Sequence, residues 1–172
     1  MNSQIIKDSR LAEEYLRVEH PSGLTMLLYP MKGFSTAYAM FSTKYGSIDT
    51  CFQRGEDADF VKVPEGIAHY LEHKMFESEE GDAFEKYAQT GASANAFTSF
   101  DKTCYLFACT DRFQESLEIL LDCVTHPYFT KETVEKEQGI IGQEIRMYED
   151  DPGWRVMFNL LQSLYQNNSV KV

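Results

Sequence analysis

The chain has 172 residues, of which 43% are hydrophobic, and a formal net charge of −11 at pH 7. This size and composition suffice for a buried core, and we expect a single domain over residues 1–172. The acidic balance, with no basic patch, argues against a nucleic-acid partner, and no apolar run is long enough to span a membrane.

The N-terminal third reads as strands. Residues 1–8 contain no long apolar segment, so we expect no signal peptide and a cytoplasmic protein. Strands are predicted over 15–18 and 24–29, around a turn at 20–23, because β-favouring residues flank a Pro-Ser-Gly sequence. A third strand, rich in aromatic residues, is predicted over 35–45, and a polar loop over 49–63 follows it.

The next segment, His69-Tyr-Leu-Glu-His73, is the most informative of the chain. It is the H-x-x-E-H form of the metallopeptidase motif. We expect it on a helix with Pro64 and Glu65 in the first turn. Residues four apart in a helix lie one turn above each other, so His69 and His73 can bind one metal ion. Glu72 lies beside them and could take a proton from water.

The alternative is a helix that carries two surface histidines by chance. The predicted helix has an apolar stripe opposite the motif, made by Ile67, Tyr70, Leu71 and Met75. His69, Glu72 and His73 therefore share the other side of the helix. This arrangement favours the metal interpretation.

Further elements follow in the chain. A short helix is predicted over 82–90 with Gly91 at its C-cap, then strands over 94–100 and 103–109. A helix with Asp111 as N-cap ends before Pro127. Strands and helices do not alternate one for one. The sequence therefore predicts an α+β fold, with a largely antiparallel sheet and helices packed on one face.

A long helix is predicted from Thr130, its N-cap, to Tyr148. Glu137 and Glu144 are seven residues apart, so they differ by only about 20° around the helix axis. We expect both at the edge of the apolar stripe. An ordinary charged helix would explain the pattern equally well without the histidines. With them, one carboxylate is expected to complete the metal site and the other to support a ligand.

Two glycines, Gly139 and Gly142, lie between these glutamates. Each costs about 1 kcal/mol in a helix interior. Such a cost predicts that another element packs closely against the helix there. A helix over 154–165 is expected after the Asp-Asp-Pro-Gly break.

These motifs together resemble the N-terminal catalytic half of the pitrilysin/insulinase/mitochondrial-processing-peptidase family of zinc metallopeptidases, most closely a bacterial cytoplasmic subgroup. The separation of His73 and Glu144, 144 − 73 = 71 residues, is slightly shorter than is usual there. The resemblance implies that Zn²⁺ is bound by His69, His73 and Glu144. It also implies that Glu72 is the general base and that Glu137 assists.

The resemblance extends to residues 91–105, which are similar to the G-x-x-x-N-A-x-T-x-x-x-x-T-x-Y strand pair of that family. It implies that an extended peptide adds to a strand edge by backbone hydrogen bonds. The residues implied in substrate binding are Asn95, Ala96, Phe97 and Thr98.

The function implied is that of a zinc-dependent metalloendopeptidase, which hydrolyses peptides or small proteins with metal-activated water. The resemblance further implies a second peptidase half or a homologous partner subunit, in a homo- or heterodimer. By the same standard the domain is truncated, and we expect the isolated chain to be weakly active or inactive. Two alternatives stay open: a non-catalytic subunit with a binding or structural role, and a zinc-stabilised fold without hydrolysis.

Overall fold

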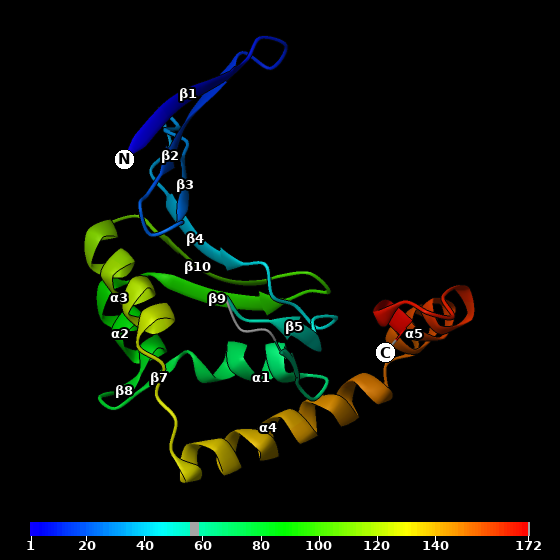
Figure 1. Ribbon diagram of the computed structural model, residues 1–172. Coiled ribbons are helices and arrows are strands. Elements are labelled where there is room, and N and C mark those ends of the chain that lie inside the picture. Colours follow the sequence, from blue (N-terminus) through cyan, green and yellow to red (C-terminus); the bar gives the residue numbers. More distant parts are fainter. Residues whose placement is uncertain (56–58, 172) are drawn as a thin grey trace. The chain divides into compact units, whose positions relative to one another are not determined.

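The computed structural model describes residues 1–55 and 59–171. Backbone contacts divide the chain into two compact units, Met1–Ser35 and Thr36–Val172, so one domain over 1–172 stays a prediction. Figure 1 shows the elements of each unit. In chain order they are β1 (Asn2–Asp8), β2 (Glu13–Glu19), β3 (Thr25–Leu28), β4 (Ala37–Thr43), β5 (Cys51–Gln53), β6 (Phe60–Lys62), α1 (Ile67–Lys74), β7 (Glu77–Ser78), β8 (Gly81–Asp82), α2 (Ala83–Thr90), β9 (Ser93–Thr98), β10 (Thr103–Cys109), α3 (Phe113–Thr125), α4 (Lys131–Glu149), α5 (Pro152–Leu164) and the 3-10 helix η1 (Ser169–Lys171).

The first unit is an antiparallel sheet in the order β1-β2-β3. The two strands predicted within it, β2 and β3, are confirmed. Strand β1 was not predicted, because its sequence is mostly polar. In the structure it is also largely exposed, with Ile5 at 60%. Its pairing with β2, in which Ile5 lies opposite Leu16, supplies the strand geometry that the local sequence does not signal.

The second unit contains the sheet β4-β10-β9, which is antiparallel throughout. Helix α1 packs against β9 and β10, α2 against β9, and α3 against β10 and β4. Figure 1 shows these helices on one side of the sheet. The predicted α+β class, with a largely antiparallel sheet and helices on one face, is confirmed.

The core of this unit lies between β10 and the helices. Phe107 of β10 is fully buried, and Tyr87 of α2 and Leu120 of α3 are 2% and 3% exposed. Tyr105 and Cys109 share the face of Phe107, because side chains alternate along a strand. Full burial of such aromatic side chains contributes about 1.5–3 kcal/mol each. The buried central strand β10 is thus the support against which α1 packs.

Several predicted helix ends are confirmed. The Asp82 carboxylate accepts from the backbone N–H of Phe84, and Gly91 ends α2 with φ +74°. Thr130 caps α4, with a reciprocal bond from Thr133. Left-handed backbone at Gly91 carries no steric penalty, which explains the sharp end of α2.

Two helix starts differ from the prediction. Helix α1 begins at Ile67, after Gly66 with φ +81°, so Pro64 and Glu65 lie outside its first turn. Helix α3 begins at Phe113, and its N-cap is Arg112 with φ +51° rather than Asp111. In both places a left-handed residue redirects the chain just before the helix. A pattern of cap residues does not signal that turn.

The segment predicted as a polar loop over 49–63 contains the hairpin β5–β6, in which Phe52 pairs with Val61. Residues 56–58 of that segment lie outside the described residues. Helix α5 begins two residues before its predicted start, with Asp151 as N-cap. Within the part of the chain that the structure describes, no helix combines the length and apolarity needed to cross a bilayer.

Candidate metal centre

Helix α1 presents its two histidines side by side. His69 and His73 are one turn apart, and their Nε2 atoms are 3.2 Å from each other. Their rings meet nearly edge to face, with centroids 4.7 Å apart. The His69 and His73 side chains are about a third and a quarter exposed, respectively.

Helix α4 brings a carboxylate to the same point. The Glu144 oxygens lie 3.7 Å from His69 Nε2 and 3.5 Å from His73 Nε2. One ligand atom from each of His69, His73 and Glu144 falls within 4.8 Å of the others. The structure therefore brings together the three residues predicted to bind the metal.

Glu137, one heptad before Glu144, contacts the other side of one imidazole. Its Oε1 is 2.7 Å from His73 Nδ1, and its side chain is only 8% exposed. If Nδ1 carries the proton and donates it to this carboxylate, the Nε2 lone pair of His73 faces His69 and Glu144. This is the arrangement that usually orients a metal-binding histidine.

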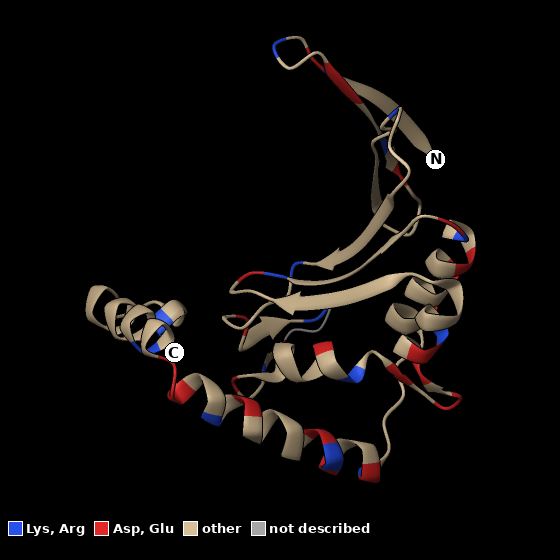
Figure 2. Cartoon of the chain, turned by 180° about the vertical axis from the view of Figure 1, so that it is seen from behind, with Lys and Arg blue, Asp and Glu red and all other residues tan. Residues whose placement is uncertain are grey.

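The buried face of α4 is displaced from its apolar residues toward the two glutamates. Glu137 is buried and Glu144 is partly buried, whereas the apolar Ile145 is 54% exposed. The buried face of α4 is itself partly acidic. Figure 2 shows acidic and basic residues along the whole length of α4.

The close packing expected around Gly139 and Gly142 is also not found. Leaving out the adjacent residues and the nearby backbone of α4 itself, no atom of the described residues lies within 4 Å of a Cβ placed at either position. The glycines therefore do not mark a contact inside this part of the chain.

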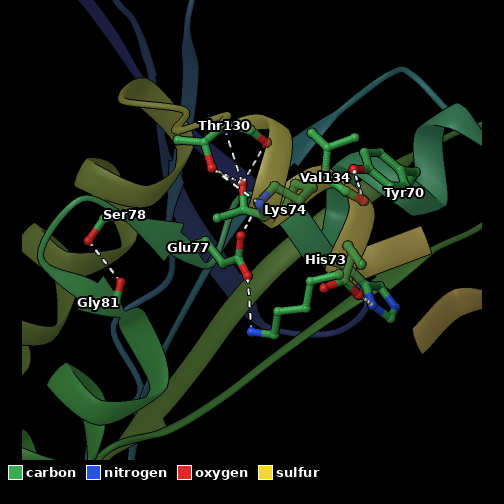
Figure 3. Close-up of polar contacts among 11 residues, drawn as sticks. Tyr70, His73, Lys74, Glu77, Ser78, Gly81, Thr130 and Val134 are labelled. Carbon is green, nitrogen blue, oxygen red and sulfur yellow. Dashed lines mark hydrogen bonds and ion pairs between the residues drawn. The ribbon is translucent and has the colours of Figure 1, made fainter. Parts of the chain in front are cut away.

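Contacts outside the ligand group join α1 to α4 (Figure 3). The Tyr70 hydroxyl donates to the backbone carbonyl of Val134 at 3.2 Å. Glu77, which follows α1, pairs with Lys74 and also with Lys136 of α4, the latter at 3.4 Å. These contacts hold together the two helices that supply the ligand atoms.

Lys74 is fully buried, which is rare for lysine. Its ammonium pairs with Glu77 and lies 5.8 Å from the centre of the Phe129 ring. Burial lowers the pKa of Lys74, and the negative charge of Glu137 acts in the opposite direction. The buried positive charge of Lys74 therefore has negatively charged neighbours, Glu77 and Glu137.

Glu72 lies on α1 beside the histidines and faces the sheet. Its Oε2 accepts a hydrogen bond of 2.8 Å from Thr98 Oγ1 at the end of β9. Burial raises the pKa of Tyr105, and the charge of Glu72 raises it further. The Glu72 carboxylate thus lies near the buried face of the sheet.

The strand predicted to bind substrate, with Asn95, Ala96, Phe97 and Thr98, is an edge strand. The order β4-β10-β9 leaves one side of β9 without a partner strand in the described residues. Asn95 and Phe97 are exposed, whereas Ala96 and Thr98 are half-buried. The Asn95 Oδ1 atom accepts from the Ala96 N–H at 2.9 Å, so this N–H is covered by a side chain rather than by a strand.

Sequence reasoning missed three features of the site: the bond from Thr98 to Glu72, the bond from Tyr70 to α4, and the pairing of Glu77 with two lysines. All are contacts between segments far apart in sequence or depend on a buried lysine, which has no local signal. Tyr148 was also missed. Burial raises the pKa of Tyr148, and the neighbouring Glu144 carboxylate adds to the effect.

The donor set fits zinc. Two imidazole nitrogens and one carboxylate oxygen are common zinc ligands, and tetrahedral zinc with bonds of about 2.0–2.2 Å sets its ligand atoms about 3.3–3.6 Å apart. The two Nε2 atoms are 3.2 Å apart here, and the shortest distances to Glu144 are 3.7 Å from His69 to Oε1 and 3.5 Å from His73 to Oε2. The group contains three residues within the described ranges 1–55 and 59–171. Three protein ligands are typical of catalytic sites, whereas structural sites usually have four.

Comparison with known proteins gives consistent matches. The family model described as "Insulinase (Peptidase family M16)" matches residues 54–172. The protein named "Uncharacterized zinc protease YmfH" from Bacillus subtilis is 48% identical over 167 residues, which cover 97% of this chain and 39% of that protein.

Solved structures agree in fold. An M16-like peptidase from Alicyclobacillus acidocaldarius superposes with a TM-score of 0.87 at 42% identity, covering 92% of this chain and 37% of that one. Pitrilysin superposes with a TM-score of 0.75 at 20% identity, covering 98% of this chain and 18% of that one, and shows likeness of fold alone. The chain thus spans about two-fifths, or less, of the length of these relatives.

Proposed function

The chain belongs to the insulinase family of peptidases, peptidase family M16, and on that premise we propose that it carries the zinc centre of a metalloendopeptidase. The observation that supports this most strongly is the convergence of His69, His73 and Glu144 within 4.8 Å. These three residues would hold the ion. A zinc ion held there would polarise a peptide carbonyl and make water more acidic.

The residues of α1 and α4 have distinct tasks in this proposal. Glu137 accepts the Nδ1–H of His73 and so keeps the Nε2 lone pair directed at His69 and Glu144. Tyr148 lies near Glu144, whose carboxylate raises the pKa of the Tyr148 hydroxyl, and in this proposal the hydroxyl restricts the orientation of that carboxylate. Both contacts fix the ligand atoms before a metal arrives, which favours binding.

Glu72 is the general base of the proposed reaction. Thr98 occupies its Oε2, which leaves Oε1 to take the proton from the attacking water. The same oxygen then returns the proton to the leaving amine of the cleaved peptide. Proton transfer by a positioned group of this kind contributes about 10²–10⁴-fold in rate.

The substrate in this proposal is an extended peptide or an unfolded segment of a small protein. It would lie along the open edge of β9 over Asn95, Ala96, Phe97 and Thr98, with backbone hydrogen bonds to the residues whose N–H and C=O face that edge. Backbone pairing gives weak sequence preference. We further propose that a second peptidase half or a homologous subunit completes the substrate site, because the chain spans about two-fifths of its relatives.

The test is to compare the complete gene product with its Glu72→Gln variant on unstructured peptides. The amide keeps the shape of the side chain but cannot accept a proton, so hydrolysis should fall by about 10²–10⁴-fold while the zinc content stays the same. Glu65→Gln, an exposed change just before α1, is the matched control and should keep full activity. Loss of zinc together with activity in Glu72→Gln would contradict the role given to Glu72.

A further inference from the structure

Thr98 makes a contact that its place in the edge strand does not require. Its Oγ1 donates to Glu72 Oε2 at 2.8 Å, across 26 residues of sequence. In the described part of the chain, Glu72 accepts a hydrogen bond from no other side chain. The orientation of this carboxylate therefore depends on one hydroxyl.

The direction of the Thr98 side chain follows from strand alternation. In β9 the exposed residues Ser93, Asn95 and Phe97 alternate with less exposed ones. Ala94 and Ala96 pack against the core beneath the helices. Thr98 shares their face because residues two apart in a strand point to the same side. Its hydroxyl is thus directed at the layer that contains α1.

The backbone of Thr98 faces a different way. The backbone N–H of Ser99 donates to the Lys102 carbonyl and closes the β9–β10 turn. The backbone N–H of Ser99 therefore faces β10. Backbone groups alternate between the two edges of an antiparallel strand, which directs the N–H and C=O of Thr98 and Ala96 to the open edge. The side-chain cover on the Ala96 N–H agrees with this assignment.

We propose that Thr98 is a positioning residue that holds Glu72 in its reactive orientation. Thr98 thereby connects the open edge of β9, where the substrate would bind, with the general base Glu72. This inference rests on the proposed function and deepens it. Thr98 contributes its side chain to the base and leaves its backbone for an extended substrate. In a purely structural role, the hydroxyl would only add to the packing of α1 on the sheet.

The experiment measures kcat, KM and zinc content for Thr98→Val, Thr98→Ser and Thr98→Ala in the complete gene product. Valine keeps the branched shape and the strand preference of threonine but removes the donor. We expect kcat to fall by about 10–100-fold, because small misplacement of a reacting group has an effect of this size. KM should change by less than about two-fold and zinc content should not change, and serine should restore most of kcat.

The matched control is Thr25→Val. Thr25 Oγ1 also donates to a carboxylate, Glu19, at the same 2.8 Å, but on an exposed strand of the other unit. This variant should keep the kcat of the unsubstituted protein. In a Glu72→Gln background, Thr98→Val should have no further effect on the residual rate, since the residue it positions no longer acts as base.

Three results would overturn the inference: an unchanged kcat in Thr98→Val, a serine variant no better than valine, or an equal loss in the Glu72→Gln background. A rise in KM alone would make Thr98 a substrate contact instead. If the valine variant does not fold, the serine and alanine variants decide, with serine expected to be the more active. Full activity in Glu72→Gln would instead overturn the proposed function, whereas an inactive Glu72→Gln with a fully active Thr98→Val would overturn this inference alone.

Discussion

Two helix pairs in residues 36–171 are joined by different kinds of contact. Helices α2 and α3 meet over β10 mainly through apolar side chains, with Tyr87, Phe107 and Leu120 at most 3% exposed. A hydrogen bond from the Ser116 hydroxyl to Thr90, at 3.0 Å, adds to this contact. Helices α1 and α4 meet through polar contacts: His73 with Glu137 at 2.7 Å, and Tyr70 with the Val134 carbonyl at 3.2 Å. Apolar burial is strong but has no direction, whereas hydrogen bonds fix orientation and add little net stability.

The difference indicates that stability and chemistry are located in separate places. The α2–α3 pair with its sheet supplies most of the buried residues of the hydrophobic core. The α1–α4 pair contains buried charges, Lys74 and Glu137, whose desolvation costs free energy. The pairing of Lys74 with Glu77 and of Glu137 with His73 offsets that cost, and the second pair also fixes the direction of a ligand atom.

The strongest way to break this comparison is to remove the centre of the core. Phe107→Ala should lower the free energy of unfolding by about 3–5 kcal/mol, because it leaves a cavity that the sheet cannot close. Denaturant titration gives the value, and Phe60→Ala, at a side chain 69% exposed, should change it by less than about 0.5 kcal/mol. A larger effect at Phe60 than at Phe107 would show that the core has been misplaced.

A smaller effect is expected where Glu137 supports His73. Glu137→Gln should weaken zinc binding by about 10–100-fold, since it removes the charged acceptor of the Nδ1–H. A competition titration with a chromophoric chelator measures the affinity. Glu135→Gln, two residues away and exposed, is the control and should leave the affinity unchanged. Equal zinc affinity in the Glu137→Gln and Glu135→Gln variants would mean that Glu137 does not support His73 as a zinc ligand.

The smallest effect concerns the link between the two helices. Tyr70→Phe removes the donor to the Val134 carbonyl and should cost about 1 kcal/mol in the free energy of unfolding. Tyr38→Phe, on an exposed tyrosine of β4, is the matched change and should cost less than about 0.5 kcal/mol. Zinc affinity should fall only in the first variant, because Tyr70, unlike Tyr38, bridges α1 and α4. If zinc affinity fell in both variants, the bond from Tyr70 to Val134 would have no specific role in zinc binding.

The ligand group was accessible to sequence reasoning because it depends on local periodicity. Spacings of four and seven residues place side chains on one face of any helix, whatever the helix packs against. The pairing of His69 with His73, and the shared face of Glu137 and Glu144, follow from that geometry alone. The structure brings both faces together, as predicted.

What the sequence did not show depends on tertiary contacts. The Thr98 bond to Glu72 requires that the end of β9 lie beside α1, which neither segment signals by itself. The burial of Lys74 beside Glu77 has no local pattern either. Hydrophobic periodicity misplaced the buried face of α4, because this helix buries Glu137 and exposes Ile145. A functional helix can therefore contradict the apolar pattern on which its orientation is predicted.

The central claim, a zinc site made by His69, His73 and Glu144, is tested most directly by metal content. Zinc per chain should be measured by elemental analysis in the unsubstituted protein, in Glu144→Gln and in the exposed control Glu149→Gln. We expect about one zinc in the unsubstituted protein and in the control, and almost none in Glu144→Gln, since two histidines alone compete poorly with water and buffer. Retention of one zinc in Glu144→Gln would contradict the claim.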